Sequence, residues 1–253
     1  MLSEAEIAQY HEDGYIIPDF RLPDEILDDI GMHHARLVAR RPEFRNFCPS
    51  LLAHETAFLA YARVPEILDM VGQVIGPDFA LWNSSFFAKP ALDGLRTPWH
   101  QDGEYWPVRP LATCTVWMAI DAATPENGCL RVIKGSHKDR RLRPHDTYVG
   151  DDVTLKQELR ADEYDETQAV DIVLERGQIS LHDVYLLHES QANTSENSRR
   201  GMTLRYMPTT SVFDRDVAHK QAIEKGVSDH SDRTVFLMRG GDPSGKNDFR
   251  VRL

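Results

Sequence analysis

The feature that most constrains the fold is a series of short apolar or alternating runs in the last two thirds of the chain. Turn-forming clusters such as Pro125-Glu126-Asn127-Gly128 separate these runs. Many short strands with frequent turns are typical of a sandwich or jelly roll, whereas a parallel sheet needs a crossover connection, usually a helix, between its strands. The chain is therefore expected to be mainly β, with a sandwich or a jelly roll, such as the double-stranded β-helix (a cupin-like jelly roll), as its core. We expect the strands at residues 79–89, 113–120, 129–133, 169–174, 178–181 and 202–207.

The residues before this region predict flanking helices. Ser3 and Glu6 have the spacing of a capping box, and Gly14 is placed to end that first helix. Apolar residues recur at helical spacing over 24–38, and Pro65 suits the first turn of a third helix. We expect these N-terminal helices to pack against the β core.

No linker, internal repeat or low-complexity tract divides the sequence, so a single domain over 1–253 is the simplest organisation. It would consist of a mostly helical N-terminal layer (1–78), the jelly-roll core (79–210) and a C-terminal extension (211–253). The segment 140–166 is charged and weakly periodic, which predicts a long loop. Whether that loop is a mobile lid is left open.

The overall charge limits the classes of partner. The chain has 29 Lys+Arg against 40 Asp+Glu, a net charge of −11 at pH 7. A surface for nucleic acid or an anionic membrane needs clustered positive charge, so neither partner is expected. The sequence has no run of about 18 apolar residues, the length of a membrane span, and no signal-peptide pattern at its start. We expect a cytoplasmic protein, as a monomer or homo-oligomer.

The cysteines are odd in number and form no C-x-x-C pair. Such residues are more often small buried side chains than metal ligands or nucleophiles. We expect Cys48, Cys114 and Cys129 to be reduced and buried.

Four His-x-Asp pairs occur, so this spacing alone does not identify a metal site. His11 lies at a predicted helix end, and His137 and His230 lie in polar segments where we expect solvated loops. His100 and Asp102 instead lie in an aromatic-rich segment between two predicted strands. Side chains two residues apart in an extended strand point to the same side, so this pair can converge on one ion.

His188 is the candidate for a third ligand, because it follows an apolar run after a turn. Two histidines and one carboxylate on one triangular face favour non-haem Fe(II), since the opposite positions stay open for a cosubstrate and oxygen. The alternative is that each histidine satisfies a local hydrogen bond.

Arg199 and Arg200 follow His188 and enter the last predicted strand. A planar guanidinium near a metal suits a dicarboxylate, because its donors pair with two carboxylate oxygens at once. Ser190 adds a hydroxyl donor beside the metal ligand. For one of the two arginines we expect a solvated surface position.

These residues belong to an ordered set of motifs that spans Trp99 to Arg199, with a similar tail at 238–248. In chain order the motifs are Trp99-His100-Gln101-Asp102, Tyr105-Trp106-Pro107, Arg109-Pro110, Val116-Trp117, Asn127-Gly128-Cys129-Leu130, Gly135-Ser136-His137, and His188-Glu189-Ser190 with Asn193 and Arg199. In this set the sequence resembles the phytanoyl-CoA dioxygenase family of Fe(II)/2-oxoglutarate oxygenases. The N-terminal third is similar only in general character.

The resemblance implies that His100, Asp102 and His188 bind Fe(II). Halogenating relatives replace this carboxylate with a small residue, so Asp102 favours hydroxylation or a related oxidation such as desaturation. The implied activity is that of a dioxygenase that uses O2 and 2-oxoglutarate to hydroxylate an unactivated C–H bond of a small molecule, with release of succinate and CO2.

The resemblance also implies a binding site for 2-oxoglutarate. Arg199 would bind the distal carboxylate, assisted by Ser190, and Trp117 would line the pocket; spacing from the ligand favours Arg199 over Arg200. A lysine that the family contributes from its N-terminal region has no counterpart that we identify. Lys134 stands where the family usually has proline, and we interpret this as a local backbone adjustment.

Candidate substrate contacts are Asn83, Phe87, Tyr105 and Trp106, which lie on or beside the strands expected to form the pocket. Arg205 follows Arg199 by an even number of residues and would share its face of a regular strand. Arg205 is either a surface residue or a contact for an anionic group on the substrate, whose identity stays open.

Two other classes of function remain. One is a jelly-roll metal-binding protein such as a zinc or manganese hydrolase or isomerase, which leaves Arg199 and Ser190 without a role. The other is a non-enzymatic small-molecule binder that retains the fold. Neither a phosphate-binding G-x-x-x-x-G-K-[ST] loop nor a G-x-S-x-G nucleophile motif is present.

Overall fold

The computed structural model describes residues 1–252. Its α-helices are α1 (Glu4–Asp13), α2 (Asp24–Arg40), α3 (Leu51–His54), α4 (Pro65–Ile75) and α5 (Arg215–Lys225). Its strands are β1 (Tyr15–Ile16), β2 (Phe47–Cys48), β3 (Phe79–Lys89), β4 (Thr97–His100), β5 (Val108–Arg109), β6 (Cys114–Ala119), β7 (Leu130–Ile133), β8 (His145–Thr147), β9 (Gln157–Leu159), β10 (Ala169–Ile172), β11 (Ile179–Asp183), β12 (His188–Ser190), β13 (Arg199–Pro208), β14 (Val212–Phe213) and β15 (Phe236–Arg239). Each of the six strands expected from the sequence is present.

The first helix begins and ends where the sequence predicts. Ser3 Oγ accepts a hydrogen bond from the backbone N–H of Glu6 at 3.3 Å, and the Glu6 carboxylate accepts one from the backbone N–H of Ser3 at 2.7 Å. Gly14 follows the helix with a φ of +84°, in the left-handed region that glycine adopts without steric cost. The capping box therefore forms as expected.

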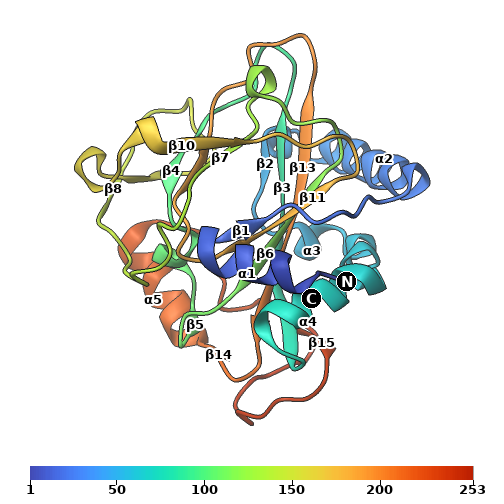
Figure 1. Ribbon diagram of the computed structural model, residues 1–253, viewed down its shortest axis with the longest axis vertical. Coiled ribbons are helices and arrows are strands. Elements are labelled where there is room, and N and C mark those ends of the chain that lie inside the picture. The colour runs from blue at the N-terminus through green and yellow to red at the C-terminus, as the bar shows by residue number, and fades with distance from the viewer. Residues whose placement is uncertain (253) are drawn as a thin grey trace.

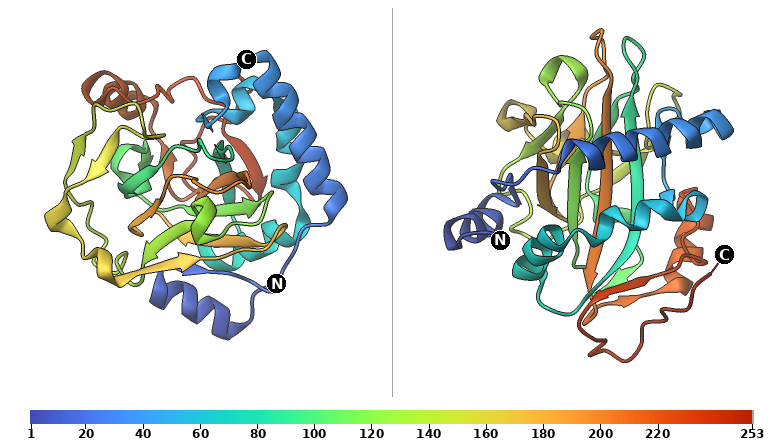
Figure 2. Two further views of the ribbon diagram at one scale, coloured as in Figure 1. Left: turned by 90° about the horizontal axis from the view of Figure 1, so that it is seen from above. Right: turned by 90° about the vertical axis from the view of Figure 1, so that its right-hand side faces the viewer.

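Two antiparallel sheets form the core. The larger has the strand order β1-β11-β6-β13-β3-β15, with β2 also paired to β3, and the smaller has the order β10-β7-β12-β4. Helices α2 and α4 lie across one face of the larger sheet, and the smaller sheet lies on its other side (Figure 1 and Figure 2). This arrangement confirms the predicted jelly-roll core packed against N-terminal helices. The larger sheet also takes in strands from the N-terminal layer and from the C-terminal extension.

Strand β13 shows how side-chain alternation divides the two faces of the larger sheet. Met202 and Leu204 pack in the core that the helices share. Arg199, Thr203 and Arg205 point the other way and line a pocket between the two sheets. Successive side chains of a strand point to opposite faces, so one strand supplies both the core and the polar pocket wall.

A β-bulge on β3 keeps polar side chains on the pocket side. Arg205 pairs with Asn83, but the next residue, Tyr206, pairs with Leu81, which leaves Trp82 without an opposite residue. The extra residue reverses the alternation within β3. As a result Leu81 packs in the core beside the helices, while Asn83 lines a cavity on the opposite face.

The segment 140–166 is not the long loop that its composition predicts. It contains β8 and β9, which pair with each other in an antiparallel hairpin. The charged residues that obscure its pattern form ion pairs, including Arg96 with Glu158 at 2.8 Å and Arg160 with Asp146 at 3.0 Å. Strands of three residues are too short to show a periodic apolar pattern.

The prediction that His137 and His230 lie in solvated loops is also wrong, because both are buried. The Nε2 atom of His137 donates to the backbone carbonyl of His11 at 3.1 Å. The ring of His230 packs against Trp82, with the ring centroids 5.7 Å apart. Segments distant in the sequence bury both histidines, and a local pattern does not reveal such contacts.

The three cysteines are free and buried, as expected. Within residues 1–252, no helix combines the length and the apolar character that a membrane span requires.

Candidate metal centre

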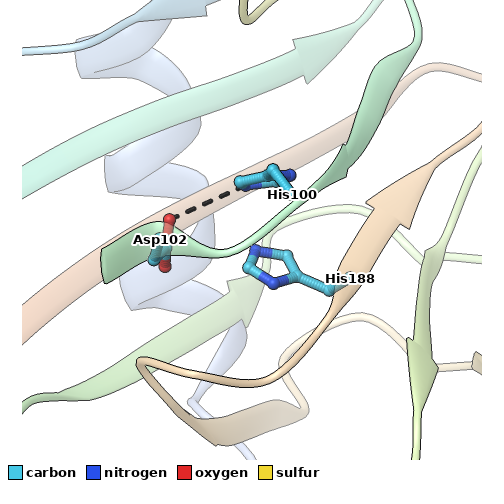
Figure 3. A group of neighbouring side chains, drawn as sticks. All are labelled: His100, Asp102 and His188. Atoms are coloured by element: carbon cyan, nitrogen blue, oxygen red, sulfur yellow. Dashed lines mark ion pairs between the residues drawn. The ribbon is translucent and has the colours of Figure 1, made fainter. Parts of the chain in front are cut away.

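His100, Asp102 and His188 lie together in the pocket between the sheets (Figure 3). All three are buried, and each offers a ligand atom within 4.8 Å of the others. Strands β4 and β12 pair so that His100 lies directly opposite His188. Asp102 begins a 3-10 turn, Asp102–Tyr105, after β4. Antiparallel pairing of β4 and β12 therefore brings His188 next to His100 and Asp102, which are already close in the sequence.

Backbone carbonyls orient both imidazole rings. His100 Nδ1 donates to the carbonyl of Pro98 at 2.8 Å, and His188 Nδ1 donates to the carbonyl of Leu186 at 2.9 Å. With the proton on Nδ1, the lone pair of Nε2 is free to bind a metal ion. The two rings lie close together, with centroids 4.1 Å apart.

The environment also sets the protonation states that metal binding requires. Burial opposes ionisation of Asp102, but contacts with His100 and His182 and the charge of Arg205 outweigh it and hold its pKa well below the usual range. Burial and the neighbouring His100 hold the pKa of His188 well below its ordinary value. A carboxylate and a neutral imidazole are the forms that ligate metals.

His182, absent from the sequence-based candidates, lies beside these three residues. Its Nε2 is 3.7 Å from Asp102 Oδ2, and its ring centroid is 5.0 Å from that of His188. Polar Ser180 and His182 alternate with apolar residues along β11. This alternation is the signal that indicates an inward-facing histidine.

Arg199 is fully buried in the same pocket. Its guanidinium donates to the carbonyl of Gly128 at 2.9 and 3.1 Å and to Ser190 Oγ at 3.4 Å. It lies over the ring of Trp117, with Cζ 5.3 Å from the ring centre. None of the ion pairs among residues 1–252 includes Arg199. Burial lowers its pKa to about 10, so the side chain stays charged at neutral pH without a carboxylate partner.

The adjacent Arg200 has a different environment. It pairs with Asp121 through two hydrogen bonds of 2.7 and 2.8 Å, and about a third of its side chain is exposed. Of the two arginines, Arg199 alone faces the pocket, which agrees with the preference from spacing.

Several motif residues hold the backbone around the site. The Gln101 side chain donates to the carbonyls of Arg141 and Tyr185. Ser136 Oγ accepts from the backbone N–H of Leu187, directly before His188. The shared motifs therefore include residues that position the ligands without contacting the ligand atoms.

Two lysines near these motifs have distinct positions. Lys134 lies in the turn after β7 and pairs with Asp13 at 3.3 Å, away from the ligand side chains. Lys89, which the sequence analysis does not select, is fully buried and donates to the carbonyl of Ser190 at 3.3 Å.

The predicted substrate contacts divide between two cavities. Phe87 and Arg205 line the metal pocket, while Asn83, Tyr105, Trp106 and again Arg205 line a second cavity. The metal pocket is also lined by Leu130 and Glu189, which belong to the shared motifs, and by Thr97, Thr115, His182 and Thr203, which do not.

Two histidines and one carboxylate in the buried pocket of a jelly roll place this chain in the class of metal-binding jelly-roll proteins. The sequence profile of the family described as Phytanoyl-CoA dioxygenase (PhyH) matches residues 1–201. The chain belongs to this family.

Curated proteins similar to this chain are named as phytanoyl-CoA dioxygenases or as proteins with that domain. Peroxisomal phytanoyl-CoA dioxygenase of Homo sapiens is 32% identical over 174 residues, which are 66% of this chain and 51% of that protein. The phytanoyl-CoA dioxygenase domain-containing protein 1 homolog of Caenorhabditis elegans is 38% identical over 128 residues, 48% of this chain and 43% of that protein. The chain thus spans about half the length of these relatives.

Solved structures show the same fold. The non-heme monooxygenase ThoJ in its apo form superimposes with a TM-score of 0.73 at 23% identity, over 93% of this chain and 84% of that one. The non-heme alpha ketoglutarate dependent carbocyclase SnoK has a TM-score of 0.71 at 21% identity, over 84% and 87% of the two chains. EvdO2 complexed with 2-oxoglutarate has a TM-score of 0.68 at 20% identity, over 82% and 91%.

Proposed function

We propose that this protein is an Fe(II)- and 2-oxoglutarate-dependent dioxygenase that hydroxylates a C–H bond of a small molecule. The observation that most supports this proposal is Arg199, a buried guanidinium with no carboxylate partner among residues 1–252, in the same pocket as His100, Asp102 and His188. The rival class of metal-binding protein leaves this arginine without an assigned role. Membership of the phytanoyl-CoA dioxygenase family points to the same chemistry.

The donor set fits iron. Two imidazole Nε2 atoms and one carboxylate form a face that leaves other coordination positions open. When bound, Fe(II) together with 2-oxoglutarate would supply the oxidising step, with succinate and CO2 as co-products. The protein would hold the metal through His100, Asp102 and His188 and keep their protonation states suited to it.

Arg199 would bind the distal carboxylate of 2-oxoglutarate. A guanidinium pairs with both oxygens of a carboxylate, and in a buried pocket this pairing would also compensate the charge of Arg199. Ser190 Oγ, within hydrogen-bond distance of Arg199, would donate to the same carboxylate. The Trp117 ring would form the apolar wall that keeps the guanidinium in place and limits water in the pocket.

The proposal predicts that the protein with Fe(II) and O2 converts 2-oxoglutarate to succinate, slowly alone and faster with the true substrate. Removing the metal with a chelator should stop succinate formation, and Fe(II) should restore it. A second measurement is independent of turnover: 2-oxoglutarate should raise the midpoint of thermal unfolding under anaerobic conditions only when metal is present. A hydrolase, an isomerase or a simple binder of another ligand would show neither response.

Gly201 offers a further test of the pocket wall. A Cβ atom at this position would lie 2.1 Å from Trp117 Cζ2, far inside any normal contact. Gly201→Ala is therefore expected to displace the ring under Arg199, to destabilise the protein by about 1–3 kcal/mol and to weaken 2-oxoglutarate binding. Thermal unfolding and titration with 2-oxoglutarate measure the two effects. The matched control is Gly241→Ala, whose Cβ would meet nothing closer than 4.0 Å; equal effects of both changes would contradict the prediction.

A further inference from the structure

Arg205 lies where two cavities meet. It lines the metal pocket and also the second cavity, which has a volume of about 170 Å³. The walls of the second cavity come from β3, the turn after β4, the β8–β9 hairpin and the segment after α5. Because Arg205 lines both cavities, a molecule in the second cavity would contact a side chain that also borders the metal pocket.

The guanidinium of Arg205 has few partners for a buried charge. The residue is 5% exposed, and its Nη1 donates to Ser85 Oγ at 2.6 Å. Its Nε is buried without a hydrogen-bond partner among the described residues. The group lies over the ring of Trp106, with Cζ 5.0 Å from the ring centre. Stacking and one hydrogen bond fix its position and leave other donors free.

A second guanidinium lies close to the first. Arg233 donates to Asn83 Oδ1 and, at 2.5 Å, to Ser50 Oγ, and its Nε is also buried without a partner among the described residues. Burial and the charge of Arg205 lower the pKa of Arg233 to about 9. The same two arginines, after burial itself, lower the pKa of the cavity-lining His230 to about 2. Two positive charges therefore lie close together here, with Arg205 in the cavity wall and Arg233 behind it.

No direct ion pair compensates this charge within residues 1–252, although Arg205 also favours the ionised form of Asp102 across the metal pocket. The described lining of the second cavity contains no Asp or Glu, and no ion pair among the described residues includes Arg205 or Arg233. Nearby acids have other partners: Glu104 pairs with Lys225, and Asp229 pairs with His219 at 2.9 Å. In a chain with a net charge of −11, this cavity is a local exception. Buried charges without counter-ions are costly, so such sites are normally paired by a ligand or partner.

We propose that Arg205, with the charge of Arg233 behind it, recognises an oxyanion, a carboxylate or phosphate group, carried by the small-molecule substrate. This inference rests on the proposed function, because it assigns the second cavity to the substrate of that reaction. Both oxyanions match the planar donor pattern of a guanidinium. The neutral analogue of the same molecule would leave the arginines uncompensated and bind weakly.

The test uses the protein with Fe(II) under anaerobic conditions and with saturating 2-oxoglutarate, so that Arg199 is already occupied. The probes are linear carboxylates from butyrate to octanoate, the primary amides of the same chain lengths, and butyl phosphate. Calorimetric titration is expected to show binding of the carboxylates or of butyl phosphate about tenfold or more tighter than that of the amides. The carboxylate and phosphate arms distinguish the two sources of the oxyanion.

Arg205→Met should weaken oxyanion binding about tenfold or more and leave amide binding unchanged, with 2-oxoglutarate binding as evidence of an intact fold. Arg205→Lys should restore part of the affinity. The matched control is Lys220→Met, which removes an exposed cation that lines neither cavity and pairs with Glu224 at 3.8 Å; its effect should be small.

Two results would overturn the inference. One is binding of oxyanions no tighter than that of the amides. The other is an Arg205→Met variant that loses Fe(II) affinity but binds carboxylates like the wild type, which would show that Arg205 serves Asp102 instead. In both cases 2-oxoglutarate would still bind and be consumed by the wild type. Absence of 2-oxoglutarate binding and consumption would instead contradict the proposed function.

Discussion

Replacing His188 with alanine is expected to lower Fe(II)-dependent succinate formation by on the order of 1,000-fold, about 4 kcal/mol in activation free energy. The change removes one of three ligands from a face whose donor atoms lie within 4.8 Å of one another. Metal affinity should fall with activity, because two remaining ligands hold the ion poorly. Metal content after gel filtration and succinate formation are the two measurements.

His182→Ala is the matched control, since His182 lies beside the same centre without belonging to the predicted ligand set. It contacts Asp102 at 3.7 Å, so its loss should lower metal affinity or activity by about 10- to 100-fold, as expected for a residue that positions a ligand. If His182→Ala abolished metal binding while His188→Ala retained it, the assignment of the third ligand would be wrong.

Replacing Arg199 with methionine is expected to raise the KM for 2-oxoglutarate by about 100-fold, which corresponds to about 3 kcal/mol for charge-assisted hydrogen bonds. The guanidinium is buried and has no carboxylate partner among residues 1–252. A bound dicarboxylate would therefore supply the negative charge that neutralises it. Steady-state kinetics at varied 2-oxoglutarate measure the effect. Metal binding should persist, because the ligand side chains lie on β4, on the turn that follows it and on β12.

Arg200→Met is a close control for this prediction, because it changes the next residue on the same strand. Arg200 pairs with Asp121 at the partly exposed surface, so the change should cost about 1 kcal/mol or less in stability and leave the KM unchanged. A rise in KM of equal size in both variants would show that the strand, and not the Arg199 side chain, is responsible.

Patterns of neighbouring residues in the sequence were enough to predict the first helix and several of the strands that line the metal pocket. The capping box at Ser3 and the alternation of strands such as β13 depend on residues a few positions apart, and these interactions form in most tertiary contexts. The even spacing of Arg199 and Arg205 placed both on one face for the same reason. That inference would have been wrong on β3, where the bulge at Trp82 reverses the alternation.

Other features depend on contacts between distant segments. His137 is buried because α1 packs against its turn, and the β8–β9 hairpin forms from strands too short to show a pattern. His182 joins the metal centre because β11 pairs with β6 in a register that faces the pocket. Such contacts follow from sheet pairing, which a single sequence does not specify.

Alternation, turn residues and an ordered motif set are local or linear properties, and they were enough to predict the class of fold, the candidate ligands and the preference for Arg199 over Arg200. Three other features became visible only in the folded protein: His100 lies opposite His188, Arg199 has no carboxylate partner within the described chain, and Arg205 lines two cavities. Each of these features depends on which segments lie next to one another and on how deeply they are buried. Whether a charge is compensated depends on which segments surround it after folding.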